Sequence, residues 1–149
     1  GADIVKSRIG LAARAQIITP DQNIADEYRK LGSYDVIIAD EAQFFTPEQI
    51  DQLRALVDED DIPVLCFGLR TDFLTHLFPG SRRLMELSDS LTEIKTVCAC
   101  GRKATVNARI DEAGRVITQG DQVFLGGNDS YVAMCHKCWV DEIKAQQEK

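Results

Sequence analysis

The sequence lacks three features that would place it in a specialised class of protein. No apolar run approaches the roughly 18 residues that a membrane span requires, so we expect no membrane association. Its 17 basic residues are outnumbered by 24 acidic ones, and the net charge of −7 opposes binding to nucleic acid, which requires a basic surface. The N-terminus has no secretory-signal pattern, so we expect a cytoplasmic protein in which disulfides are disfavoured.

A phosphate-binding loop is also missing where one is expected. The stretch VIIADEAQFF, residues 36–45, is a short apolar run that breaks off into two adjacent acids. This pattern is typical of a buried strand that delivers carboxylates to a metal-phosphate site, although a solvent-facing strand end has the same form. No Gly-x-x-x-x-Gly-Lys-Ser/Thr segment precedes it, and neither Lys6 nor Lys30 follows a glycine-rich turn.

What is present predicts an α/β body. The segments Thr19-Pro-Asp-Gln and Thr46-Pro-Glu-Gln each predict a helix start with an N-cap, a proline at the first helical position and Gln at the third. The first helix is expected to stop at Gly32, and nearly unbroken apolar runs at 36–39 and 62–68 predict strands of a parallel sheet covered on both faces. The expected inward-facing residues are Ile24, Tyr28 and Leu31 in the first helix and Ile50, Leu53, Leu56 and Val57 in the second.

The expected secondary structure changes near Glu93, from helices and apolar strands to short strands flanked by cysteines. Before it, a third helix is expected from Ser81 to Leu91, with Leu84, Leu87 and Leu91 inward. After it, short strands are expected at 105–110, 116–118 and 123–125, the first two joined by a turn at 111–114. We therefore divide the chain into an α/β body, residues 1–93, and a small cysteine-bearing lobe, residues 94–149, that ends in a helix.

Four of the five cysteines form two tight pairs, Cys98-Ala-Cys100 and Cys135-His-Lys-Cys138. In a reducing compartment, such pairs flanking hairpin-like sequence predict four thiolates around one structural zinc ion. Two alternatives are reduced thiols in a small core, or His136 in place of one sulfur. Cys66, alone in an apolar run, is expected to be a small buried hydrophobe. His76 and His136 are expected to be surface residues or to support a neighbouring site residue, and not to be catalytic themselves.

The acids and their neighbours suggest a nucleotide site. Asp40 is expected to face a hydrated Mg²⁺ that bridges phosphates, and Glu41 to accept a proton from an attacking hydroxyl. Gln43 offers an amide to a base edge, and the two phenylalanines that follow it offer stacking faces, although they could equally be core. The segments at 68–73 and 126–131 are expected to line the same pocket, the first because it leaves a strand at its carboxyl end.

Four separated motifs carry a resemblance to a known family. DEAQFF, GLRTDF, CxCGRKA and GGNDSYVAMCHKCW, in this order, closely resemble the bacterial type of thymidine kinase, whose relatives include the cytosolic enzyme of animals. The similarity runs from Ser7 to Trp139. It implies a parallel sheet like that of P-loop NTPases, with helices on both faces, and a zinc-ribbon-like β lobe. It also implies transfer of the γ-phosphoryl group of ATP to the 5′-hydroxyl of thymidine or deoxyuridine, with Mg²⁺, in salvage of DNA precursors.

The resemblance also implies roles for individual residues. Glu41 matches the catalytic base and Asp40 the acid associated with Mg²⁺, while Arg8 falls near the phosphate site. The residues that match the nucleoside site are Gln43, Phe44, Leu69, Phe73, Gly127, Asn128, Ser130 and Tyr131, and those that match the zinc ligands are Cys98, Cys100, Cys135 and Cys138. Members of the family are commonly homotetramers inhibited by thymidine triphosphate.

The departure from the family lies at the N-terminus. Family members place a strand and a phosphate-binding loop ahead of the Ser-Arg-Ile-Gly segment, which here begins at residue 7. We interpret the chain as lacking roughly fifty residues of that unit, and expect it to bind nucleoside weakly and not to turn over alone. The rival hypothesis is a non-enzymatic zinc-ribbon module that binds a protein or nucleic acid. Thermal stabilisation by thymidine would distinguish the two.

Overall fold

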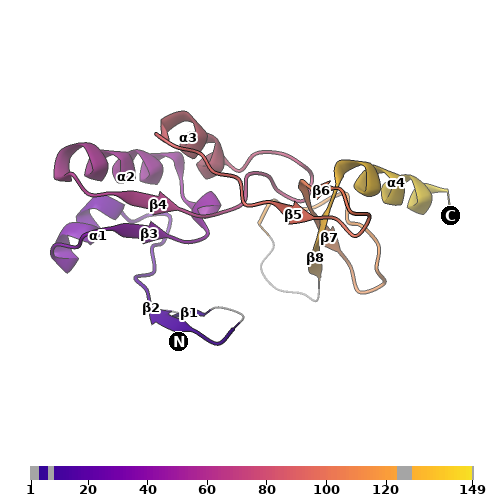
Figure 1. Cartoon of the computed structure of the whole chain (residues 1–149), viewed down its shortest axis with the longest axis horizontal. Helices are drawn as coiled ribbons and strands as arrows, with labels where there is room; N and C mark the ends of the chain where they lie inside the picture. Colours follow the sequence, from indigo (N-terminus) through magenta and orange to yellow (C-terminus); the bar gives the residue numbers. More distant parts are fainter. Residues whose placement is uncertain (1–3, 7–8, 124–128, 149) are drawn as a thin grey trace.

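The structure is a computed structural model that describes residues 4–6, 9–123 and 129–148. Two groups of elements lie at opposite ends of an elongated molecule (Figure 1). The first group comprises α1 (Ile24–Leu31), β3 (Ile37–Ala39), the short 3-10 helix η1 (Ala42–Phe44), α2 (Pro47–Asp60), β4 (Val64–Cys66) and α3 (Pro79–Leu87). The second comprises β5 (Thr96–Val97), β6 (Lys103–Ala104), β7 (Val106–Ile110), β8 (Ser130–Met134) and α4 (His136–Gln147).

A parallel strand pair is the centre of the α/β body. Strands β3 and β4 pair in parallel, with Ile37 opposite Val64 and Ala39 opposite Cys66, and α2 connects them. The prediction of parallel strands at these two runs is confirmed. Because both strands run in the same direction, their carboxyl ends meet at one edge of the pair, where Asp40 follows directly.

Helices cover one face of this pair among the described residues. The buried core consists of Ile24, Ala25, Ile50, Leu53, Leu56 and Ile62, and the inward side chains of β3 and β4 pack against it. On the opposite face Ile38 is 67% exposed and Leu65 is 45% exposed. The expectation of a sheet covered on both faces is therefore not met within this part of the chain.

The two predicted helix starts turned out differently. Thr46 caps α2 as expected: its side chain accepts from Gln49 N, and the Gln49 side chain accepts from Thr46 N. The first prediction is wrong, since α1 begins at Ile24 and is capped by Asn23. Gln22 N does donate to the Thr19 carbonyl at 3.0 Å, and Gln22 Oε1 accepts from Thr19 N at 2.8 Å, so a single turn forms at Thr19 without continuing into α1. The Gln49 amide of α2 also donates to the carbonyls of Thr19 and Gln22, at 2.8 and 3.0 Å.

The ends of the other predicted helices also differ in detail. Gly32 follows α1 with φ 109°, as predicted, but Leu31 is 50% exposed and does not face the core. Helix α3 begins at Pro79 and ends at Leu87, earlier than predicted at both ends, and Leu91 is 63% exposed beyond it. Leu84 and Leu87 do pack on the core.

The cysteine-bearing lobe is built on an antiparallel ladder. Strands β7 and β8 pair so that Arg109 lies opposite Tyr131. Strand β7 was predicted, whereas no strand was predicted at β8, and the strand predicted at 116–118 is only a single bridge between Val116 and Ile110. Val123 lies outside any strand, and the rest of the strand predicted at 123–125 falls outside the described residues.

Two further features complete the fold. An exposed antiparallel hairpin, β1 (Ile4–Lys6) with β2 (Ala12–Arg14), precedes α1 and was not predicted. It lies apart from both groups of elements (Figure 1). None of the helices in the described part of the chain combines the length and apolar character needed to cross a membrane.

Candidate functional site

The two acids predicted to carry the chemistry lie at the carboxyl end of β3. Both Asp40 and Glu41 are exposed, and the Glu41 backbone N–H donates to Asp40 Oδ1 at 2.9 Å. Glu41 adopts a left-handed backbone conformation, with φ 52° and ψ 40°. Such a conformation costs a non-glycine residue on the order of 1 kcal/mol and occurs frequently at functional sites.

Gln43 lies directly behind Glu41 in η1. It is 2% exposed, and its Nε2 donates to Glu41 Oε2 at 2.5 Å while its Oε1 accepts from Leu69 N at 3.2 Å. The sequence suggested that this amide pairs with a base edge. Here both polar atoms of the amide already bond protein atoms, so Gln43 connects the candidate base to the loop after β4.

Gly68 makes this connection possible. A Cβ at this position would lie 2.4 Å from Gln43 Oε1 and 3.1 Å from Gln43 N, so any side chain would displace the amide. The next carbonyl, that of Leu69, accepts a hydrogen bond from Ser81 Oγ at 2.5 Å. The GLRTDF segment is thus fixed at its start by η1 on one side and by α3 on the other.

Two of the predicted nucleoside-binding side chains are open to solvent at this edge. Leu69 is 40% exposed and Phe44 is 48% exposed. Phe44 meets Phe78 edge-on, with ring centroids 5.6 Å apart and an interplanar angle of 86°. The Phe44 ring is therefore in aromatic contact with Phe78 while about half of the residue stays open to solvent. Phe45, by contrast, packs against the core, which was the plain alternative for the pair.

The other two predicted aromatic residues meet around an arginine that the sequence reasoning missed. Arg109 of β7 is 2% exposed, and its guanidinium carbon lies 3.8 Å from the centroid of the Phe73 ring. Its Nε donates to the Tyr131 hydroxyl at 3.0 Å. Phe73 is itself only 2% exposed, whereas Tyr131 is 48% exposed. No signal for this was available in the sequence, because the alternation in Val106–Ile110 places Arg109 on the same face as Asn107, the face expected to be exposed.

A second contact joins the loop after β4 to the cysteine-bearing lobe. Asp72 is 6% exposed, and its Oδ1 accepts from the backbone N–H groups of Leu74 and His76 at 2.8 and 3.0 Å. Its Oδ2 accepts from Gln122 Nε2 at 2.9 Å. Asp72 thus connects the loop after β4 to Gln122. Arg109, which lies against Phe73 of the same loop, also donates from Nη2 to the Asp121 carbonyl at 3.1 Å.

The remaining predicted positions fall largely outside what the structure describes. Arg8, Gly127 and Asn128 lie outside the described residues. Ser130 begins β8 and is exposed. His76 and His136 are both exposed, and the expectation that neither is catalytic stays a prediction.

The four paired cysteines converge in the second group of elements. The sulfurs of Cys98, Cys100, Cys135 and Cys138 all lie within 4.8 Å of one another, and none of the four forms a disulfide. The sulfurs of Cys100 and Cys135 are 3.7 Å apart. Zinc bound by four thiolates at about 2.3 Å places neighbouring sulfurs about 3.8 Å apart in a tetrahedron. The residues present therefore fit a closed zinc site, and His136 is not among the clustered ligands.

The backbone around the cluster prepares two of the thiols for ionisation. Backbone hydrogen bonds at Cys100 and Cys135 lower the pKa of the Cys98 thiol to about 6. A backbone hydrogen bond from Cys138 likewise lowers the pKa of Cys135, whose sulfur accepts from Cys138 N at 3.4 Å. Hydrogen bonding to the sulfur of Cys135 raises the pKa of the Cys138 thiol to about 12. Four neighbouring thiols cannot all ionise without a cation, which is the condition that a bound metal relieves.

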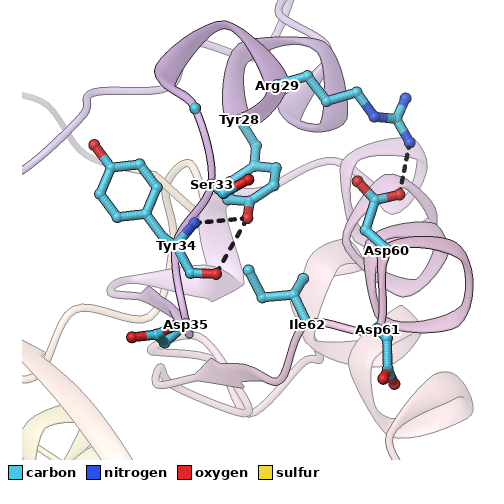
Figure 2. A pocket seen from close by; sticks show the side chains of 9 residues that line it. Tyr28, Arg29, Ser33, Tyr34, Asp35, Asp60, Asp61 and Ile62 are labelled. Atoms are coloured by element: carbon cyan, nitrogen blue, oxygen red, sulfur yellow. Dashed lines mark hydrogen bonds and ion pairs between the residues drawn. The ribbon is translucent and has the colours of Figure 1, made fainter.

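A surface pocket of about 640 Å³ lies away from these groups (Figure 2). It opens next to the amino ends of β3 and β4, where Tyr34 and Ile62 contribute to its lining. Figure 2 shows that Arg29 turns toward Asp60, with which it forms an ion pair at 3.2 Å. The strand-end acids lie at the opposite ends of the same strands, so this pocket is not part of the candidate site.

An α/β body with two acids at a strand end, joined to a four-cysteine lobe, agrees with the class of phosphotransferases that the motifs indicated. The family model described as thymidine kinase matches residues 1–139, and the chain belongs to the thymidine kinase family. This membership favours the kinase interpretation over the non-enzymatic zinc-ribbon module.

Named relatives agree with this assignment. The chain is 49% identical to the thymidine kinase of Ruegeria pomeroyi, over 93% of the chain and 72% of the relative. It is 47% identical to that of Yersinia pseudotuberculosis, over 97% of the chain and 76% of the relative. It is 45% identical to that of Escherichia coli strain K12, over 100% of the chain and 77% of the relative.

Proposed function

We propose that the protein transfers the γ-phosphoryl group of ATP to the 5′-hydroxyl of thymidine or deoxyuridine, in the salvage of DNA precursors. The observation that carries the proposal is the position of Glu41 beside Asp40 at the end of β3, in a chain of the thymidine kinase family. A carboxylate in that position can accept the proton of an attacking hydroxyl, and open α/β sheets bind their ligands at this edge.

Glu41 is the proposed general base. Its carboxylate is exposed, so a bound hydroxyl can reach it, and the hydrogen bond from Gln43 restrains one of its two oxygens. The other oxygen remains the proposed proton acceptor. Phosphoryl transfer needs little covalent help from protein, so positioning of the hydroxyl supplies most of what this residue contributes.

Asp40 is the proposed partner of Mg²⁺. When bound, Mg²⁺ neutralises charge that develops on the transferring phosphoryl group. Mg²⁺ takes oxygen ligands and retains most of its waters, so one exposed carboxylate next to bound phosphates is a fitting contribution from protein. Asp40 Oδ1 accepts from Glu41 N, which leaves the second carboxylate oxygen for the hydrated ion.

Phe44, Leu69, Phe73 and Tyr131 are the proposed enclosure of the thymine ring, with backbone groups of the segment from Gly127 to Ser130 holding its edge. Solvent exposure of Phe44, Leu69 and Tyr131 supports this, since these apolar side chains are the ones free to be covered by a ligand. The zinc site is the proposed structural anchor of this enclosure, because its four sulfurs leave no open position for catalysis.

The wider features of the proposal follow from the family. We propose a P-loop-NTPase-like parallel sheet with helices on both faces, and the bare apolar face at Ile38 and Leu65 supports a further layer. The division into an α/β body, 1–93, and a zinc-binding lobe, 94–149, agrees with the two groups of elements in Figure 1. A cytoplasmic homotetramer, inhibited by thymidine triphosphate, completes the proposal.

The proposal is tested by transfer of labelled γ-phosphate from ATP to thymidine. The intact protein used here and below includes the phosphate-binding loop that the family resemblance places ahead of the segment starting at Ser7. We expect labelled thymidine monophosphate with wild type and about a hundredfold less turnover with Glu41→Gln, since removal of a general base typically costs that much. Glu48→Gln, an exposed change on α2, is the matched control and should retain wild-type turnover. Absence of any phosphorylated nucleoside with zinc-loaded, folded wild type would refute the proposal.

A further inference from the structure

We infer that Arg109 is a positioning residue for the nucleoside site: it holds the Phe73 and Tyr131 rings in a fixed relation across the junction between the α/β body and the cysteine-bearing lobe. The inference rests on the proposed function, because its consequence for binding concerns the same nucleoside. No motif in the sequence identified Arg109, and its own atoms are buried beneath the exposed Tyr131 ring.

The contacts of Arg109 reach three separate segments. Its guanidinium carbon lies 3.8 Å from the centroid of Phe73, in the loop after β4, and 5.6 Å from the centroid of Tyr131, in β8. Nε donates to the Tyr131 hydroxyl at 3.0 Å, and Nη2 donates to the Asp121 carbonyl at 3.1 Å. A planar guanidinium can stack on one ring and donate in its own plane to a second, which a lysine ammonium cannot do.

The surroundings are shaped to this guanidinium. Gly120 has φ +135°, and a Cβ there would lie 3.3 Å from Arg109 Nη1 and 3.7 Å from Phe73 Cζ. Burial of a charged side chain costs free energy, and well-packed apolar residues often replace buried ionic groups without loss of stability. A buried arginine that meets two rings and a carbonyl is therefore better explained by the geometry it imposes than by stability.

The geometry determines what Tyr131 can do. With its hydroxyl engaged by Arg109, the Tyr131 ring cannot rotate its polar tip toward a bound base, and it offers an aromatic face and edge. Stacking on such a face suits a planar pyrimidine. The contact from Asp72 to Gln122 at 2.9 Å supports the same junction independently and restrains the segment that includes Asp121. Arg109 thus acts on the nucleoside through Tyr131 and Phe73.

The test is a double-mutant cycle in the intact protein, with Tyr131→Phe, Arg109→Met, their combination, and Arg109→Lys. The matched control is Arg115→Met, because Arg115 belongs to the same lobe but its side chain is 70% exposed and pairs with Asp111. The measurements are kcat, KM for thymidine, KM for ATP, bound zinc, and the thermal-unfolding midpoint without ligand.

We expect Tyr131→Phe and Arg109→Met each to raise the KM for thymidine about tenfold, the effect of losing a hydrogen bond from a charged donor, with kcat and the KM for ATP nearly unchanged. The double variant should be no worse than Arg109→Met alone, Arg109→Lys should not restore binding, and zinc content should stay at the wild-type level. An unchanged KM in Tyr131→Phe, or effects that multiply to about a hundredfold in the double variant, would overturn the inference. If Arg109→Met does not fold, the KM for thymidine of Tyr131→Phe alone decides whether the inference stands.

The thermal midpoints separate this inference from the proposed function. If wild type does not phosphorylate thymidine, the proposed function fails. The contact between Arg109 and Tyr131 is then tested by the thermal-unfolding midpoints of the variants without ligand. Shifts of the midpoint that are smaller in the double variant than the sum of the single shifts support the tie between Arg109 and Tyr131. Additive shifts refute it.

Discussion

Gln43 separates two hypotheses about the site, and Gln43→Met is the substitution that decides between them. The sequence suggested that the amide pairs with the base, in which case its loss should weaken nucleoside binding. The structure places the amide between Glu41 and Leu69, in which case its loss should misplace the proposed base. Methionine keeps the length and most of the volume of glutamine but has no amide.

The magnitude follows from the two hydrogen bonds that the amide makes. The bond from Nε2 to Glu41 Oε2, at 2.5 Å, has a charged acceptor, and such bonds contribute about 1.5–3 kcal/mol. Because the Glu41 carboxylate is exposed, the lower end applies, and about 1.5 kcal/mol corresponds to roughly a tenfold loss in kcat. The Leu69 N–H loses its acceptor as well, which should lower the stability of the fold by about 1 kcal/mol.

Steady-state kinetics with varied thymidine is the assay, with thermal unfolding to confirm that the variant folds. We expect kcat to fall about tenfold with the KM for thymidine within about twofold of wild type. Gln52→Met serves as the control, because Gln52 also bonds a backbone N–H, that of Ile24, but lies away from the acids. An unchanged kcat with a strongly raised KM would refute the reasoning and return Gln43 to the base-contacting role.

Three further outcomes are expected. Glu41→Gln should lower kcat at least a hundredfold while thymidine binding, measured by calorimetry, is retained; unchanged kcat with raised KM would make Glu41 a binding residue. Protein purified without chelators should contain one equivalent of zinc by elemental analysis, and less than about half would contradict the four-sulfur site, as would Cys138→Ser retaining full zinc. Thr46→Ala should lower the free energy of unfolding by about 1 kcal/mol in denaturant titration, because it removes the N-cap of α2, whereas Thr118→Ala, an exposed change, should have little effect.

The features that could be predicted from the sequence are those determined by local chemistry. The capping box at Thr46 needs only residues within one turn, and it formed as expected. The cysteine pairs carry their own spacing, and their sulfurs converge. The apolar runs at β3 and β4 are short and bounded, so their parallel pairing was also predictable.

The features that were missed depend on contacts between distant residues. Thr19 has the same local pattern as Thr46 and forms one turn with Gln22, but Gln49, 30 residues away, bonds that turn to α2, and the helix begins only at Ile24. Strand β8 was missed because two glycines precede it in the sequence, a pattern typical of loops. Its pairing with β7 depends on residues that are distant in the sequence. Arg109 gained its role only when that register set it opposite Tyr131 and the loop after β4 brought Phe73 against it.

The position of the metal site explains why a kinase of this kind carries a cysteine-bearing lobe at all. Cys135 follows β8 immediately and caps α4, so a metal bound there fixes the end of the strand that carries Tyr131. Cys98 and Cys100 lie at the turn between β5 and β6, so the same metal joins that hairpin to β8. A metal bound by these four sulfurs would therefore fix the part of the lobe in which Arg109 meets Tyr131. Loss of zinc should therefore act first on nucleoside binding, since the strand-end acids lie on the α/β body and their local contacts do not pass through the lobe.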